Sequence, residues 1–150
     1  MLQDALLAYA HFFAILATAT TLALEAVLCR PGLRWPQVGL LGRIDLFYFG
    51  AAILALASGL ARVFWGLKGA PFYLQNPLFY VKIGLFVIVA LVSIAPTIQF
   101  IRWMRQAESH GDKPVPLAEV GRTRRFVLSE LALLALIPLA AVLMARGFGY

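Results

Sequence analysis

Four residues that could do chemistry recur at every seventh position near the start of the chain: Asp4, His11, Thr18 and Glu25. On an α-helix, seven residues fall about 20° short of two full turns, so these side chains form one slowly drifting stripe. The residues between them are mostly apolar, and a charge near the centre of a bilayer costs about 3 kcal/mol. The stripe should therefore face other helices, with His11 in the half nearer the N-terminus and Glu25 in the opposite half.

A first set of candidate site residues joins His11 to basic side chains at a similar expected depth. It consists of His11, Arg62, Lys82, Met144 and Arg146. An imidazole can coordinate a metal or transfer a proton, and cations can hold an anionic ligand. Haem b fits this set, because an imidazole binds iron and cations bind the propionates. Alternatively, the basic side chains reach lipid headgroups, while His11 makes one interhelical hydrogen bond.

The candidate ligand residues are compatible with either iron or copper. His110 falls in a polar loop, so the sequence supplies one intramembrane histidine. The iron of a haem would then need Met144, water or the histidine of a second subunit, which makes a homodimer or larger membrane complex a candidate assembly. A metal pair of His11 and Met144 would suit a copper ion equally well.

A second set of polar residues is expected toward the opposite ends of the helices. It consists of Glu25, Arg43, Asp45 and Glu130, with Arg30, Arg124 and Arg125 nearby. The carboxylates could relay protons from the cytoplasm. The favoured interpretation is that they form ion pairs that hold the helix ends together. Asp45, at the expected start of a helix, would also lie beside the positive end of the helix dipole.

Four apolar runs must position these residues, at about 5–29, 44–65, 78–101 and 126–145. Each has about the 20 residues needed to cross a hydrocarbon core roughly 30 Å thick. The chain is 62% hydrophobic and only 13% charged, whereas about a quarter of the residues of a soluble protein are charged. We therefore predict an all-α membrane protein in which residues 1–150 form a single domain, a bundle of four transmembrane helices.

The basic residues indicate how this bundle is oriented. The first and third loops with their flanks hold nine of them: Arg30, Arg34, Arg43, Arg102, Arg105, Lys113, Arg122, Arg124 and Arg125. Under the positive-inside rule these loops are cytoplasmic, and both termini lie on the outer side of the membrane. This topology explains the net charge of +6 without a nucleic-acid partner, and the expected partners are membrane lipids.

Local patterns add three expectations. Ala51, Ala55 and Gly59 stand four apart, which allows a neighbouring helix to approach closely. Pro116 followed by Glu119 could start a cytoplasmic extension of the fourth helix. Short matches between the two halves predict two hairpins related by a pseudo-two-fold axis along the membrane normal. These matches are Leu7-x-Tyr9-x-His11 with Leu78-x-Tyr80-x-Lys82, and Ala61-Arg62-x-Phe64 with Ala145-Arg146-x-Phe148.

Several motifs carry a resemblance over nearly the full length. They are His11, Glu25 with Arg30-Pro31-Gly32, Arg43-x-Asp45, the string from Gly59 to Gly69, Phe72-Tyr73-x-x-Asn76-Pro77, Lys82, and Met144-Ala145-Arg146-Gly147. With these motifs the chain resembles a bacterial membrane family described as domain of unknown function 2214.

A more distant similarity is to HemJ-type protoporphyrinogen oxidases and CopD-type copper-resistance membrane proteins. These share a histidine early in one membrane helix and a lysine early in a later one, as His11 and Lys82 stand here. The resemblance implies haem or copper chemistry, with a haem-dependent oxidoreductase as the implied enzyme. The chain departs from the oxidase pattern in having one intramembrane histidine. A non-catalytic subunit of a membrane complex, in which both polar sets are structural, is the remaining alternative.

Overall fold

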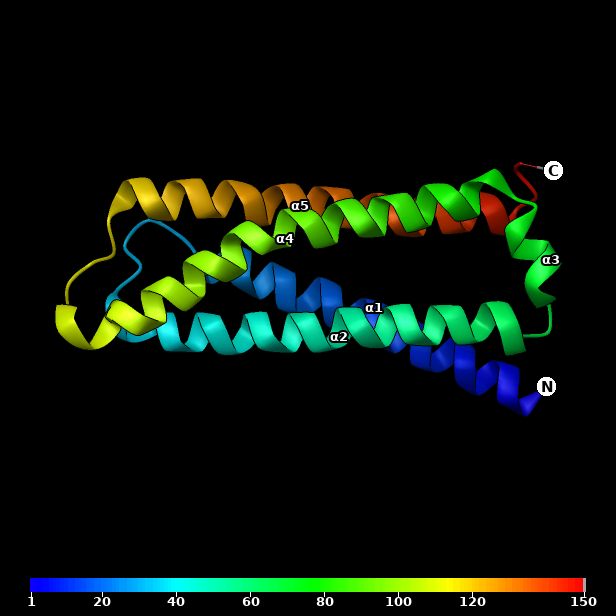
Figure 1. The fold of residues 1–150 in the computed structure, drawn as a ribbon, viewed down its shortest axis with the longest axis horizontal. Helices are drawn as coiled ribbons and strands as arrows, with labels where there is room; N and C mark the ends of the chain where they lie inside the picture. The colour runs from blue at the N-terminus through cyan, green and yellow to red at the C-terminus, as the bar shows by residue number, and fades with distance from the viewer. Residues whose placement is uncertain (150) are drawn as a thin grey trace.

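The computed structural model describes residues 1–149, which are helical apart from their connections (Figure 1). The elements are α1 (Leu2–Leu28), a short 3-10 helix η1 (Trp35–Gln37), α2 (Val38–Trp65), α3 (Gly69–Leu74), α4 (Pro77–His110) and α5 (Leu117–Ala145). Helices α1, α2, α4 and α5 are long and apolar enough to cross a membrane. The prediction of an all-α protein with four such helices is therefore confirmed.

The helix ends differ from the apolar runs at the polar side of the bundle. α2 begins at Val38, six residues before the expected start at 44, and α4 continues to His110 rather than ending at 101. The extra turns of α4 are polar and those of α2 contain two glycines and Arg43, so hydropathy alone does not mark them as helix. The predicted extension of the last helix is confirmed, because α5 begins at Leu117 directly after Pro116. The short helix α3 lies in a stretch that we expected to be only a loop.

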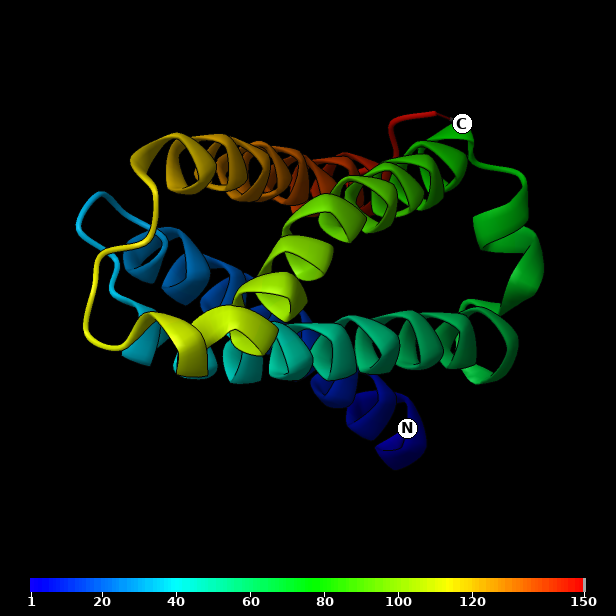
Figure 2. The same cartoon turned by 60° about the vertical axis from the view of Figure 1, so that its left-hand side comes forward.

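The four long helices form two hairpins, with α1 packed along α2 and α4 along α5. The hairpins meet where α2 contacts α4 and where α1 contacts α5. Figures 1 and 2 show that they converge at one end of the molecule and spread apart at the other, where α3 bridges them. Most buried hydrophobic residues belong to the converging half, including Leu22, Leu41, Phe100, Trp103 and Val127.

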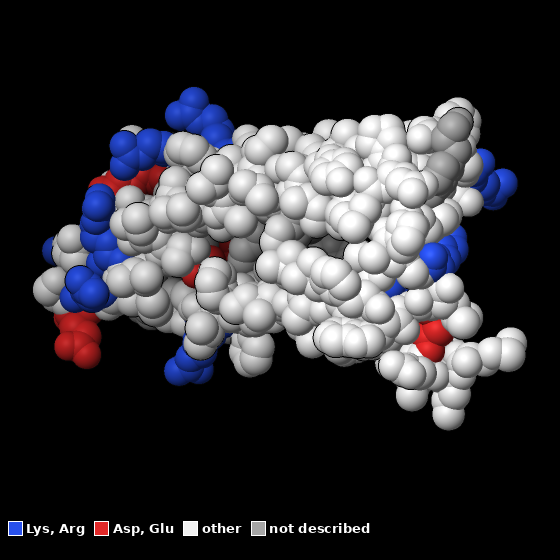
Figure 3. Space-filling view, turned by 45° about the vertical axis from the view of Figure 1, so that its right-hand side comes forward, with Lys and Arg blue, Asp and Glu red and all other residues white. Residues whose placement is uncertain are grey.

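We call the converging end the basic end, because it carries the nine basic residues of the first and third loops and their flanks. Figure 3 shows Lys and Arg gathered over this end, while the middle of that face carries few charged side chains. The two loops join there: the Trp35 amide donates to the Lys113 carbonyl at 3.1 Å, and the Val115 amide donates to the Leu33 carbonyl at 2.8 Å. These bonds tie the hairpins together outside the apolar region.

The other end, which we call the terminal end, holds both termini and α3 (Figure 1). Asn76 organises it. Its Oδ1 accepts from the Leu78 amide at 2.9 Å and caps α4, and its Nδ2 donates to the Phe148 carbonyl at 3.0 Å. One buried side chain thus joins the start of α4 to the segment that follows α5.

Candidate functional site

His11 lies at the contact between α1 and α2. Its Nδ1 is 3.0 Å from the Ala55 carbonyl oxygen and 3.1 Å from Ser58 Oγ. A carbonyl oxygen can only accept, so the bond to Ala55 requires the proton on Nδ1. The neutral ring then keeps its lone pair at Nε2, the form in which an imidazole can bind a metal or take up a proton.

The small residues of α2 make this position of His11 feasible. A Cβ atom added at Gly59 would lie 2.9 Å from His11 Cε1 and 3.7 Å from Nε2. Only glycine leaves room for the ring, while Ala55 and Ser58 supply the polar atoms that orient it. The expected close approach of a neighbouring helix to the small residues of α2 is therefore confirmed at Ala55 and Gly59. The space that these residues leave is filled by the His11 side chain of α1.

Two cations share the surroundings of His11. Arg62 and Lys82 both interact with it electrostatically, and both are half-buried. Arg62 Nε is buried and has no hydrogen-bond partner, and its guanidinium carbon lies 5.8 Å from the centre of the Phe12 ring. We call His11, Arg62 and Lys82 the outer cluster. Within residues 1–149 no carboxylate forms a salt bridge with Arg62 or Lys82, so the cluster carries uncompensated positive charge.

The other expected members of this set have different surroundings. Met144 is buried and packs with Val63 and Tyr73, and Arg146 is exposed beyond the end of α5. In the described part of the chain, no group of three or more histidine, cysteine or acidic side chains is arranged to hold a metal ion. The pairing of His11 with Met144 at a copper ion stays a prediction.

A second cluster lies nearer the basic end and draws on all four long helices. It contains Glu25 of α1, Asp45 and Tyr48 of α2, Thr97 of α4 and Glu130 of α5. The Tyr48 hydroxyl donates to Glu130 Oε2 at 3.1 Å, and the Thr97 hydroxyl donates to Asp45 Oδ1 at 2.9 Å. Glu25 interacts electrostatically with both Asp45 and Glu130. We call these five residues the inner cluster.

The inner cluster corrects two expectations. Glu25, Asp45 and Glu130 form no salt bridge with any described basic residue, so the interpretation as ion pairs is wrong. Most basic residues of this end are exposed, including Arg30, Arg43 and Arg125. Their side chains are long enough to reach water, whereas the shorter side chains of the buried acids cannot leave the interior to meet them. Asp45 also lies two turns inside α2 and not in its first turn.

Two members of the inner cluster were missed from the sequence. Tyr48 follows Asp45 by three residues, a spacing that puts both on one face of a helix and could have indicated it. Thr97 carries no comparable signal, because a threonine in an apolar run most often bonds to its own helix.

The long apolar helices and the buried charges between them define an integral membrane protein with four helices able to cross the bilayer. The chain belongs to the family described as "Predicted membrane protein (DUF2214)", whose family model matches residues 3–149. The resemblance seen in the motifs is thereby confirmed. No curated protein and no solved structure matches the chain.

Proposed function

We propose that this protein binds an anionic redox cofactor of the haem b type through its outer cluster. The observation that carries the proposal is the bond between His11 Nδ1 and the Ala55 carbonyl, 3.0 Å long. It fixes the tautomer that presents Nε2 as a free ligand nitrogen, and a second partner of this kind is usual for metal-binding histidines.

The charges around His11 support an anionic ligand. A cation within the membrane is normally paired or reaches the interface, because desolvation makes an unpaired charge costly. Arg62 has a buried Nε without a partner, and Lys82 lies within electrostatic reach of it. Propionate carboxylates would supply the missing acceptors and offset the positive charge.

The residues fit such a group in part. His11 would supply one ligand to iron, while Arg62 and Lys82 would hold the carboxylates. A second histidine ligand would come from a second copy of the chain, so a homodimer belongs to the proposal. When bound, the group would supply electron transfer, and His11 would orient it.

The location of the protein is part of the same proposal. With the basic end in the cytoplasm, both termini and the outer cluster lie toward the periplasmic side of a bacterial inner membrane. The two hairpins, with His11 in one and Lys82 in the other, would be related by the pseudo-two-fold axis.

The test is a titration of the detergent-purified protein with haem b, followed by its absorption spectrum. We expect a Soret band that saturates, and we expect His11→Ala to weaken binding at least about tenfold, which corresponds to about 1.4 kcal/mol. His110→Ala is the matched control, because His110 stacks on Trp35 at the basic end and should leave the band unchanged. A wild-type protein that takes up no haem, or equal binding by His11→Ala, would refute the proposal.

The same protein preparation distinguishes haem from two other ligands, phospholipid headgroups and copper. If the outer cations serve only phospholipid headgroups, Arg62→Gln changes lipid retention and no haem band forms. If copper is the ligand, metal analysis after copper loading finds it in the wild type and not in His11→Ala. Met144→Leu then shows whether the methionine takes part.

A further inference from the structure

The inner cluster contains more buried acid than its surroundings can neutralise. Glu25 and Glu130 are each 1% exposed and Asp45 is 7% exposed. Transfer of an unpaired carboxylate into a protein interior costs several kcal/mol, and three together also repel one another. Since no described cation pairs with them, the three groups cannot all be ionised. The three carboxyl groups must therefore bind at least one proton or another cation.

Two carboxyl oxygen atoms indicate where this proton or cation is bound. Glu25 Oε1 and Glu130 Oε1 are buried and have no hydrogen-bond partner. Glu130 Oε2 already accepts a hydrogen bond from the Tyr48 hydroxyl, and Asp45 Oδ1 accepts one from the Thr97 hydroxyl. Hydroxyl donors suit carboxyl groups that share protons, and water molecules can bridge the remaining oxygens in a polar site. A metal ion is less well served, because no three described acidic or histidine side chains are arranged to hold one.

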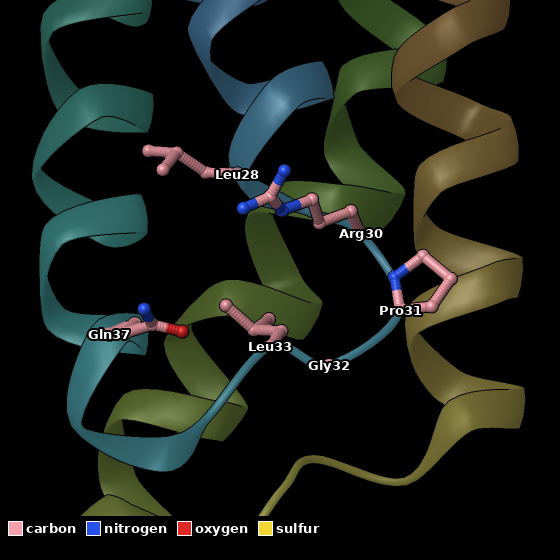
Figure 4. A pocket seen from close by; sticks show the side chains of 6 residues that line it. All are labelled: Leu28, Arg30, Pro31, Gly32, Leu33 and Gln37. Carbon is pink, nitrogen blue, oxygen red and sulfur yellow. The ribbon is translucent and has the colours of Figure 1, made fainter.

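A pocket at the basic end lies close to this site along α1. It is lined by Leu28, Arg30, Pro31, Gly32, Leu33 and Gln37 (Figure 4). Leu28 follows Glu25 by three residues on α1, a rise of about 4.5 Å, and the Cys29 amide donates to the Glu25 carbonyl at 2.7 Å. The pocket therefore begins about one helical turn from the first acid of the cluster.

We propose that Glu25, Asp45 and Glu130 form a reversible proton-binding site that is loaded through this pocket. The groups that face it are Tyr48 on α2 and Thr97 on α4, and the Cys29 thiol interacts electrostatically with Glu25 and with Arg124 of α5. Glu25 is the first acceptor in this proposal, because it precedes the pocket-lining Leu28 by three residues on α1, and Asp45 and Glu130 share the proton with it. The site is independent of the outer cluster, since Glu25 follows His11 by fourteen residues, about 21 Å along α1.

The test is infrared spectroscopy of the full chain in lipid nanodiscs across a range of pH. We expect a carbonyl stretching band of protonated carboxyl groups at neutral pH, a shift of that band in D2O, and its reversible loss as the pH is raised. Glu25→Gln and Glu130→Gln should each remove part of the band. Glu108→Gln, an exposed acid at the basic end, is the control that should leave it unchanged. Asp45→Asn serves if a glutamate variant fails to fold.

The route is tested with Leu28→Trp, which fills the pocket, against Leu24→Trp, which adds the same bulk on an exposed, lipid-facing position of α1. We expect slower deuterium exchange of the carboxyl band only in Leu28→Trp. No band at neutral pH, or a band that neither titrates nor exchanges, would overturn the proposal. A band that appears only after Na⁺ or Ca²⁺ is removed would also overturn it, because the site would then hold a metal cation.

Discussion

The imidazole of His11 lies directly against the backbone of Gly59, where an added Cβ atom would be only 2.9 Å from Cε1. This contact joins α1 to α2 in the half of the bundle that has few buried residues. It also makes Gly59 a specific requirement of the His11 position rather than a general packing residue.

Gly59→Ala should therefore displace the imidazole and break its bond to Ala55. Overpacking of this kind costs about 1–3 kcal/mol, which a denaturant titration in detergent would measure. Gly84→Ala is the matched control, because an added Cβ there meets nothing within 4 Å. If both variants have the same free energy of unfolding, the contact between His11 and Gly59 does not limit stability.

Asn76 should stabilise the terminal end through both of its side-chain bonds. Asn76→Ala removes the cap of α4 and the bond to Phe148, and loss of a cap alone costs about 1 kcal/mol. Asn76→Ser keeps a hydroxyl acceptor for the Leu78 amide and adds no buried charge, so it should be less harmful. Thermal unfolding should rank wild type, Asn76→Ser and Asn76→Ala in that order, with the exposed Gln75→Ala close to wild type.

Glu119 should hold α4 and α5 together near the basic end. Its Oε2 accepts from Trp103 Nε1 at 2.7 Å and from Gln99 Nε2 at 3.0 Å. Glu119→Ala leaves the donor of the buried Trp103 side chain unsatisfied, at a cost of about 1–3 kcal/mol. Unfolding followed by circular dichroism should show this loss, and the exposed Glu108→Ala should not. An equal effect of the two variants would contradict the role of Glu119.

The Cys29 thiol should be inert in the folded protein. Cys29 is fully buried, and burial raises the pKa of its thiol to about 11, so almost no thiolate is present at neutral pH. A maleimide should label it only after denaturation in SDS. Rapid labelling of the folded protein would mean that the basic end opens.

The orientation can be read with cysteines placed at exposed sites in a Cys29→Ser background. Gln75 lies at the terminal end and Glu108 at the basic end, and both are exposed. An impermeant maleimide added to intact cells should label Gln75→Cys and not Glu108→Cys. The reverse pattern would put the basic end outside and remove the predicted route from the cytoplasm.

The four membrane helices could be predicted from the sequence because a bilayer demands about 20 apolar residues for each crossing, and the chain contains four such runs. The polar extension of α5 could be predicted from Pro116 and Glu119, but that of α4 could not, since α4 continues through Arg102, Arg105 and Gln106, which hydropathy assigns to a loop. The inward stripe of α1 predicted that Glu25 is buried, and it is. What faces Glu25 depends on the rotation of three other helices, and no single periodicity gives that.

The hairpins converge where the buried core lies and spread apart where α3 spans between them. Because most of the buried core lies at the basic end, a movement of α3 would change the separation of the hairpins at the terminal end more than it would change the spacing of Glu25, Asp45 and Glu130. On the two proposals made above, a ligand bound at the outer cluster would leave the arrangement of the three acids unchanged.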